Sequence, residues 1–154
     1  MSAQQVSVSR TIAATPAQLF GIVADASLHH VIDGSGTVRG AKGKPEPLHL
    51  GSKFAMRMHL GIPYVIGSTV VEFEQDRRIA WCHLGKHRWR YEFEALDPVD
   101  GQPQTKVTET FDWSTARSPK AIELAGYPKR HVPNMERTLD RLDAFVTNRT
   151  SALA

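Results

Sequence analysis

Six consecutive stretches with the period of β-strands lie between residues 36 and 114, and this run restricts the possible folds more than any other feature. Short breaks rich in Gly, Pro and Asp separate the stretches. Because such short connections join hairpin neighbours, the sheet is predicted to be antiparallel. The strands are expected at about 37–40, 50–59, 64–74, 78–84, 87–96 and 105–114.

A seventh strand and two short helices are predicted before this run. Val6, Val8 and Ile12 alternate with polar residues, which indicates a strand with one wet face. A capping sequence follows at 15–18, with Thr as the cap, Pro in the first turn and Gln three residues after the Thr. It predicts a helix, and a second short helical stretch is expected over 26–32.

Helical periodicity returns after Ser114. A short helix is predicted to begin at Ser118-Pro119 and to be interrupted by 126–128. A long amphipathic helix follows, with an apolar face at Met135, Leu139, Leu142 and Val146. This order of elements predicts an α+β fold in which a curved antiparallel sheet of about seven strands wraps around the C-terminal helix.

Length and composition favour one globular domain over residues 1–154. The chain is 41% hydrophobic and 23% charged, and its longest apolar runs fall far short of the ~20 residues that cross a bilayer. The N-terminus has neither a basic patch nor an apolar stretch of signal-peptide length, so we expect a cytoplasmic protein. Its net charge is +3, but the basic residues are scattered, so no nucleic-acid partner is expected. We expect a monomer or a homodimer.

Metal and cofactor chemistry is not predicted. Cys82 is the single cysteine, so the chain has no internal disulfide and no Cys pair for zinc. The adjacent His29 and His30 lack a helical i, i+4 arrangement, and a turn separates His83 from His87. The glycines of the segment 34–40 have the wrong spacing for a dinucleotide loop. We therefore expect no metal and no cofactor.

The predicted inner face of the sheet and the apolar face of the last helix supply the candidate ligand-binding residues. Alternate residues of a strand share one face, so strand parity selects the inward set. In 64–74 the parity is ambiguous: Val65, Thr69, Val71 and Phe73 are favoured over Tyr64, Ile66 and Val70. The candidates are Phe54, Met56, Met58, Val71, Phe73, Trp81, His83, Trp89, Tyr91, Phe93, Glu109, Phe111, Trp113, Met135, Leu139 and Leu142.

These aromatic and Met side chains have two interpretations. Large adaptable apolar walls with few polar groups are typical of a pocket for a hydrophobic ligand. The same residues would also fill an ordinary hydrophobic core. Both interpretations remain open from the sequence.

Two polar residues, His83 and Glu109, fall on predicted faces made otherwise of aromatic side chains. In an apolar cavity the pKa of the Glu109 carboxyl would rise, and beside an imidazole it would act as a general acid or base. They are therefore the candidate catalytic residues. Alternatively, His83 reaches water at a strand end, or Glu109 pairs with an Arg or Lys at the cavity mouth.

Three segments, LFGIVAD at 19–25, IDGSG at 32–36 and VEFEQDRRIAW at 71–81, together with the order of elements, resemble the START-like superfamily. Within it the chain is most similar to the bacterial polyketide cyclase/dehydrase-type (SRPBCC) group, over residues 4–148. This resemblance implies a helix-grip fold. Members carry lipids, sterols, polyketides or plant hormones, a few catalyse cyclisation or dehydration, and one branch assists a chaperone. The chain departs from the pattern at 28–31, where many relatives have an aromatic residue, often Trp.

We therefore expect a binding protein that encloses a small hydrophobic molecule, such as a lipid, a polyketide or an aromatic metabolite, between the sheet and the last helix. One alternative is a cyclase or dehydratase-type enzyme that uses His83 and Glu109. A second alternative is a chaperone-linked interaction module, which requires an exposed apolar patch on the outer sheet or helix. The outward strand positions are mostly charged, which argues against that module.

Overall fold

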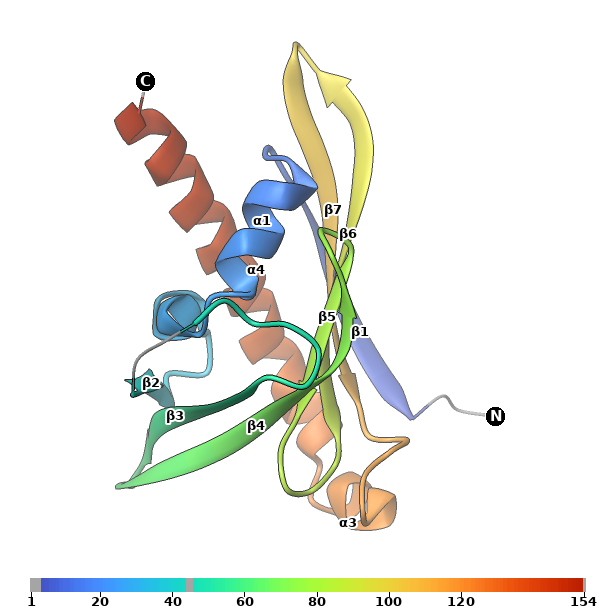
Figure 1. The fold of residues 1–154 in the computed structure, drawn as a ribbon. Coiled ribbons are helices and arrows are strands. Elements are labelled where there is room, and N and C mark those ends of the chain that lie inside the picture. Colours follow the sequence, from blue (N-terminus) through green and yellow to red (C-terminus); the bar gives the residue numbers. More distant parts are fainter. Residues whose placement is uncertain (1–3, 44–45, 154) are drawn as a thin grey trace.

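The computed structural model describes residues 4–43 and 46–153. Seven antiparallel strands form one sheet in the order β1-β7-β6-β5-β4-β3-β2. Figure 1 shows this sheet bent around α4, with the short helices on the same side as α4. The predicted α+β fold is confirmed. The strands are β1 (Gln5–Ile12), β2 (Val38–Lys42), β3 (Lys53–Leu60), β4 (Ile62–Glu74), β5 (Arg78–Cys82), β6 (Arg88–Val99) and β7 (Gln102–Asp112).

Local sequence signals define the helices that follow β1. The Thr15 hydroxyl accepts a hydrogen bond from the Gln18 amide, and the Gln18 side chain accepts one from the Thr15 amide, so the predicted capping box is present. Asp25 caps the next turn through the Ser27 amide. These helices are α1 (Pro16–Val23), η1 (Ala26–Leu28) and α2 (His29–Ile32).

The C-terminal region contains α3 (Pro119–Leu124) and α4 (Tyr127–Leu153). Gly126 separates them with a positive φ of 71°, a conformation that glycine adopts without strain. The long helix therefore begins at Tyr127 itself, with Pro128 in its first turn. It packs against β1, α2 and β7, and its predicted apolar face is buried.

The hairpin between β6 and β7 is tighter than the sequence predicts. A break was expected over 97–101, but the strands continue to Val99 and from Gln102, and only Asp100 and Gly101 form the turn, both with positive φ. The register shifts between Leu96 and Val99. This irregularity accommodates Pro98, which has no N–H for the ladder.

A β-bulge in β4 resolves the ambiguous parity of this strand. Val70 pairs with Trp81 and Glu72 pairs with Ala80, so Val71 is the extra residue. Before the bulge, Ile66 and Val70 pack in the core, and the favoured inward assignment of Val65 is wrong because Val65 is 52% exposed. After the bulge Phe73 packs against the core, as favoured.

Two buried clusters lie between the sheet and the helices. The larger contains residues of the strands, of α1 and of α4, including Leu139 and Leu142. The smaller consists of Phe111, Trp113 and Met135. Trp89 packs against both clusters and connects them. The interior of the fold is therefore rich in aromatic rings, and the candidate site lies among them.

Candidate ligand-binding site

Strand register arranges the inward side chains of β5, β6 and β7 in successive layers. Ile79 pairs with Tyr91, and Tyr91 pairs with Glu109, so these three residues form one layer. The next layer, two residues along each strand, contains Trp81, Trp89 and Phe111. Glu109 therefore lies beside an aromatic layer on the inner face.

A continuous series of contacts links Phe54 on β3 to Glu109 on β7. The Phe54 ring meets Trp81 edge to face at 5.7 Å between centroids, and Trp81 stacks on Tyr91 at 5.6 Å. The Tyr91 hydroxyl then donates a hydrogen bond of 2.9 Å to Glu109 Oε1. We call this series, Phe54–Trp81–Tyr91–Glu109, the aromatic path. It presents ring faces and edges on the way to one buried polar pair.

The Tyr91–Glu109 pair is enclosed by the protein. Tyr91 is 5% and Glu109 is 4% exposed. The pKa of Glu109 is raised to about 8: burial raises it most, the Tyr91 hydrogen bond lowers it, and the nearby negative charge of Asp33 raises it. Burial and the adjacent carboxyl also raise the pKa of Tyr91. At neutral pH the pair therefore holds two protons and can donate or accept a hydrogen bond.

His83 is placed elsewhere. Its Nδ1 lies 2.8 Å from the Ser68 hydroxyl, and its ring meets the His87 ring. His83 is four residues beyond Ile79, which shares a layer with Glu109, so the two candidate catalytic residues lie roughly 13 Å apart along the strands. The structure does not bring them together as a pair. The alternative in which Glu109 pairs with an Arg or Lys is wrong, since its partner is Tyr91.

The other end of the interior carries three imidazoles. His131 on α4 meets Phe111 at 4.6 Å and Trp89 at 5.0 Å. Burial lowers the pKa of His131 and of His83 to about 4, and the neighbouring His87 contributes to both shifts. Burial also lowers the pKa of His87. These rings are therefore neutral at pH 7 and behave as polar aromatic groups.

The remaining candidate lining residues divide between the two clusters. Met56, Phe93, Leu139 and Leu142 are buried in the larger cluster. Phe54, Met58 and Phe73 are partly buried against it. Phe111, Trp113 and Met135 form the smaller cluster. Val71 is the bulge residue of β4 and is half-buried, because the bulge removes it from the strict alternation of the strand.

Sequence reasoning missed two residues of the interior. His29 stacks on Trp81 at 4.8 Å and its Nε2 lies 2.7 Å from the Val23 carbonyl oxygen, so the segment 28–31 supplies a ring to the interior. His131 precedes Met135 by four residues, and this helical spacing predicts the same buried face. A search for rings of every type on the apolar face of the last helix would have found His131.

Two pockets open at the rim of the domain. The smaller, about 200 Å³, lies among β2, β3 and the segment 46–52, and Phe54 is in its wall. Because Phe54 also begins the aromatic path, this pocket adjoins the apolar interior.

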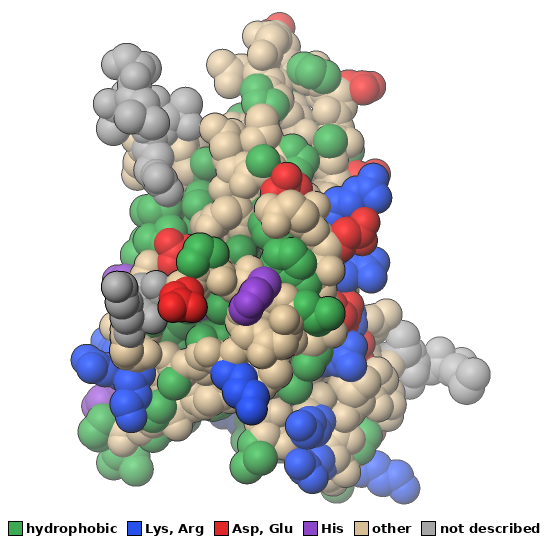
Figure 2. Space-filling view, in the orientation of Figure 1, with side chains coloured by type: hydrophobic (Ala, Val, Ile, Leu, Met, Phe, Trp, Pro, Cys, Tyr) green, Lys and Arg blue, Asp and Glu red, His purple; other side chains and the backbone are tan. Residues whose placement is uncertain are grey.

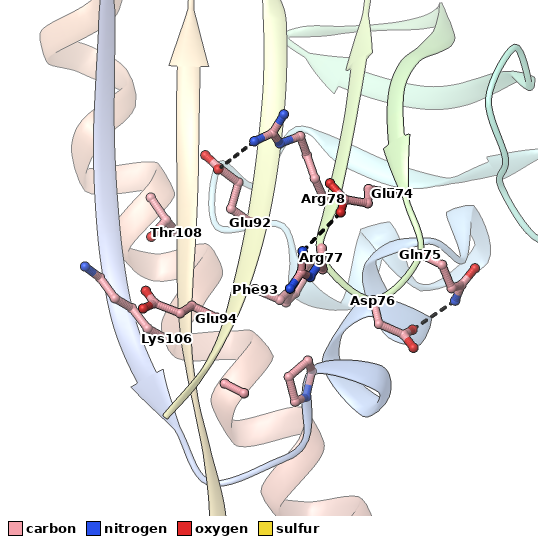
Figure 3. Close-up of a pocket in the computed structure, with 12 residues that line it drawn as sticks. Glu74, Gln75, Asp76, Arg77, Arg78, Glu92, Phe93, Glu94, Lys106 and Thr108 are labelled. Atoms are coloured by element: carbon pink, nitrogen blue, oxygen red, sulfur yellow. Dashed lines mark hydrogen bonds and ion pairs between the residues drawn. The ribbon is translucent and has the colours of Figure 1, made fainter. Parts of the chain in front are cut away.

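The larger pocket, about 620 Å³, lies by the β4–β5 turn and β6 (Figure 3). Its wall is mostly charged, with ion pairs Arg77–Glu74 and Arg78–Glu92. It does not match the expected apolar site.

The outer face of the sheet is charged around Glu72, while Leu60, Ile62 and Val65 are exposed at the β3–β4 hairpin. Glu72 accepts hydrogen bonds from Arg88 and Arg90, and Arg90 also pairs with Asp112. These arginines lower the pKa of Glu72. Figure 2 shows basic and acidic side chains alternating along the right-hand side of the molecule. The charged part of this face does not have the apolar character that an interaction module requires.

Two further properties concern the part of the chain that the structure describes. No group of three or more His, Cys, Asp or Glu side chains there is arranged to hold a metal ion. None of its helices combines the length and the hydropathy needed to span a bilayer.

A bent seven-stranded sheet closed over a terminal helix, with one polar pair among buried rings, defines a helix-grip domain of the START-like class. Within this class the chain belongs to the polyketide cyclase/dehydrase and lipid transport family, whose profile matches residues 3–146. The family resemblance predicted from sequence is confirmed.

Relatives with known sequences or structures share this domain. The uncharacterised protein Rv0088 of Mycobacterium tuberculosis is 43% identical over 143 residues, which are 90% of this chain and 62% of that protein. The chain thus spans less than two thirds of this relative. NE0264 of Nitrosomonas europaea has a TM-score of 0.70 at 12% identity, covering 98% of this chain and 99% of that one.

The di-domain ARO/CYC StfQ from the steffimycin biosynthetic pathway has a TM-score of 0.63 at 13% identity, covering 96% of this chain and 52% of that one. At such identities the structural likenesses concern the fold alone.

Proposed function

We propose that this chain is a single ligand-binding domain that encloses a small hydrophobic molecule between the sheet and α4. Membership of a family described by polyketide and lipid chemistry supports the ligand class. The observation that carries the proposal is the aromatic path, which runs from a pocket at the rim to a buried polar pair. Apolar walls supply binding free energy by burial, and one polar pair orients the ligand.

The pocket at Phe54 is the proposed entrance. Phe54 is half-buried, so one part of its ring faces the pocket and another part contacts Trp81. A ring of the ligand would take the place of Trp81 against Phe54. Little additional apolar surface of Phe54 would then be exposed to water. The proposed route therefore proceeds from Phe54 along Trp81 to Tyr91.

Native mass spectrometry of the purified protein tests this function. We expect a mass excess that disappears under denaturing conditions, and a hydrophobic compound in the organic extract. Phe54→Asp places a charge at the proposed entrance and should lower the bound fraction at least tenfold. His59→Asp, on an exposed outward position of the same strand, is the matched control and should bind normally. Thermal unfolding of both variants identifies any loss of folding.

The proposal fails if neither a bound compound nor binding of added hydrophobic probes is detected. It also fails if Phe54→Asp and His59→Asp, both folded, bind equally well, because the entrance would then be irrelevant.

A cyclase or dehydratase-type activity is the second candidate function. The raised pKa of Glu109 in an apolar setting favours it, since such a carboxyl holds a proton at neutral pH. The geometry favours Tyr91 rather than His83 as the partner of Glu109. If turnover of a polyketide-like substrate is the same in wild type and Glu109→Gln, the enzymatic role is wrong.

A further inference from the structure

Glu109 Oε2 is the starting point, because it is buried and has no hydrogen-bond partner among the residues that the structure describes. The other carboxyl oxygen accepts the Tyr91 hydroxyl. Buried side-chain oxygens in native proteins nearly always have a partner, since an unpaired one has lost its water without compensation. An unpaired oxygen at the inner end of the aromatic path therefore indicates the position of a ligand's polar group.

The surroundings of Oε2 restrict the chemistry of that group. A ligand carboxylate or phosphate would be repelled by the negative charge of Asp33, which already acts on Glu109. An ammonium has three donors, and Oε2 is the only buried side-chain acceptor without a partner among the described residues. Two of its donors would be buried without partners among rings. Charged ligands are therefore disfavoured.

A hydroxyl group matches Oε2 in both protonation states of Glu109. When the carboxyl is ionised, Oε2 accepts the hydroxyl proton. When it is protonated, as the raised pKa favours at neutral pH, the carboxyl O–H donates to the hydroxyl oxygen. A carbonyl or ether pairs only with the protonated form, and an N–H donor pairs best with the ionised form.

We propose that the bound molecule is a neutral apolar compound with a hydroxyl group, and that this hydroxyl pairs with Glu109 Oε2. The inference rests on the proposed function, because it assigns a ligand class to the same interior. Tyr91 keeps Oε1 occupied and so directs Oε2 toward the ligand. The apolar part of the compound then lies against Trp81 and Phe54.

Three matched probes separate the roles of ring and hydroxyl: 1-naphthol, 1-methoxynaphthalene and naphthalene. Isothermal titration calorimetry at pH 7 should show naphthol binding at least about tenfold more tightly than naphthalene, the size expected for one added hydrogen bond in a buried site. The methoxy compound, whose oxygen only accepts, should bind more tightly than naphthalene at pH 7 and should lose that advantage above about pH 8, where Glu109 is ionised, whereas naphthol should keep it.

Glu109→Leu removes the carboxyl and retains an apolar side chain. It should bind naphthalene as well as wild type does and lose the preference for naphthol. Glu94→Gln, an exposed carboxyl of β6, is the control and should keep the preference. If Glu109→Leu does not fold, Glu109→Met provides the same comparison, because it also lacks the carboxyl, and it should lower the ratio of naphthol to naphthalene affinity at least threefold.

Two results would overturn the inference in different ways. If wild type binds naphthalene as tightly as naphthol, the hydroxyl assignment is wrong while the apolar site stands. If wild type binds none of the three probes, the proposed function itself fails, and the inference fails with it.

Discussion

At the residue scale, the partner of Glu109 determines what the interior can do. Strand parity alone selects Glu109 as a polar residue on an apolar face, but it does not identify the partner. Tyr91 lies directly opposite Glu109 in the β6–β7 ladder, and that register depends on a two-residue turn with a bulge beside it. The arginines that might have neutralised Glu109, such as Arg90, lie on the other face with Glu72 and Asp112.

The raised pKa of Glu109 predicts a specific pH dependence of stability. The carboxyl ionises near its ordinary value of 4.5 when unfolded and at about 8 when folded. The stability that it contributes is therefore fully present below about pH 4.5 and is lost as the pH rises through 8. Glu109→Gln cannot ionise. Its free energy of unfolding should therefore rise relative to that of wild type by up to about 1.4 kcal/mol per pH unit between pH 5 and 8.

Chemical denaturation of both proteins across this range measures the difference in the free energy of unfolding. Taking the difference removes the opposite effect of His83 and His131, whose lowered pKa values make both proteins lose stability as the pH falls below 6.5. Glu94→Gln should show a flat difference. A flat difference for Glu109→Gln as well would mean that the Glu109 carboxyl is ionised in the folded protein.

At the element scale, irregularities decide which side chains enter the core. Period-two alternation predicts one parity for all of 64–74, but the bulge at Val71 switches it within the strand. Of the two parities considered from the sequence, one is therefore correct before the bulge and the other after it. Alternation cannot reveal such a switch, because a bulge adds a residue without changing the apolar composition of the strand.

A matched pair of substitutions in β4 tests this arrangement. Val70 is 1% exposed and pairs with Trp81, so Val70→Ala should lower the free energy of unfolding by about 2 kcal/mol. Val65 lies on the exposed side, and Val65→Ala should change stability by less than about 0.5 kcal/mol. Urea denaturation measures both. Equal losses would contradict the assigned parity.

The contact between α4 and the turn before β2 gives a second prediction at this scale. A Cβ at Gly34 would lie 2.5 Å from the Asn134 carbonyl oxygen and 2.6 Å from the Thr138 nitrogen. Gly34→Ala should therefore destabilise the protein by roughly 1–3 kcal/mol. Gly21→Ala, in α1 with no atom within 4 Å, should stabilise it by up to about 1 kcal/mol. Thermal unfolding checks the signs, and a stable Gly34→Ala variant would contradict this close packing.

At the scale of the whole molecule, the order of elements predicted the layers because each element shows its period clearly. The apolar face at Met135, Leu139 and Leu142 requires a partner, and a run of hairpin strands supplies a sheet to cover it. The shape of the interior was not predicted by the order of elements. The predicted lining residues form two packed clusters joined by Trp89, and the two pockets described above open at the rim.

This difference has a physical cause. Room between packed layers depends on rotamers, bulges and turn geometry at the scale of single atoms, and a hydrophobic pattern encodes none of these. The charged pocket by the β4–β5 turn was not predicted for the same reason. Apart from Phe93, its walls come mostly from residues that the sequence pattern assigns to a turn or to a solvated face.

A crystal structure of the protein with 1-naphthol tests the central claim most directly. We predict electron density for the ring system against Trp81 and Phe54, with the naphthol oxygen within hydrogen-bond distance of Glu109 Oε2. Density confined to the charged rim pocket would contradict the claim. So would an interior in which Trp81, Phe93, Phe111 and Leu139 remain closely packed at saturating naphthol, with no ligand among them.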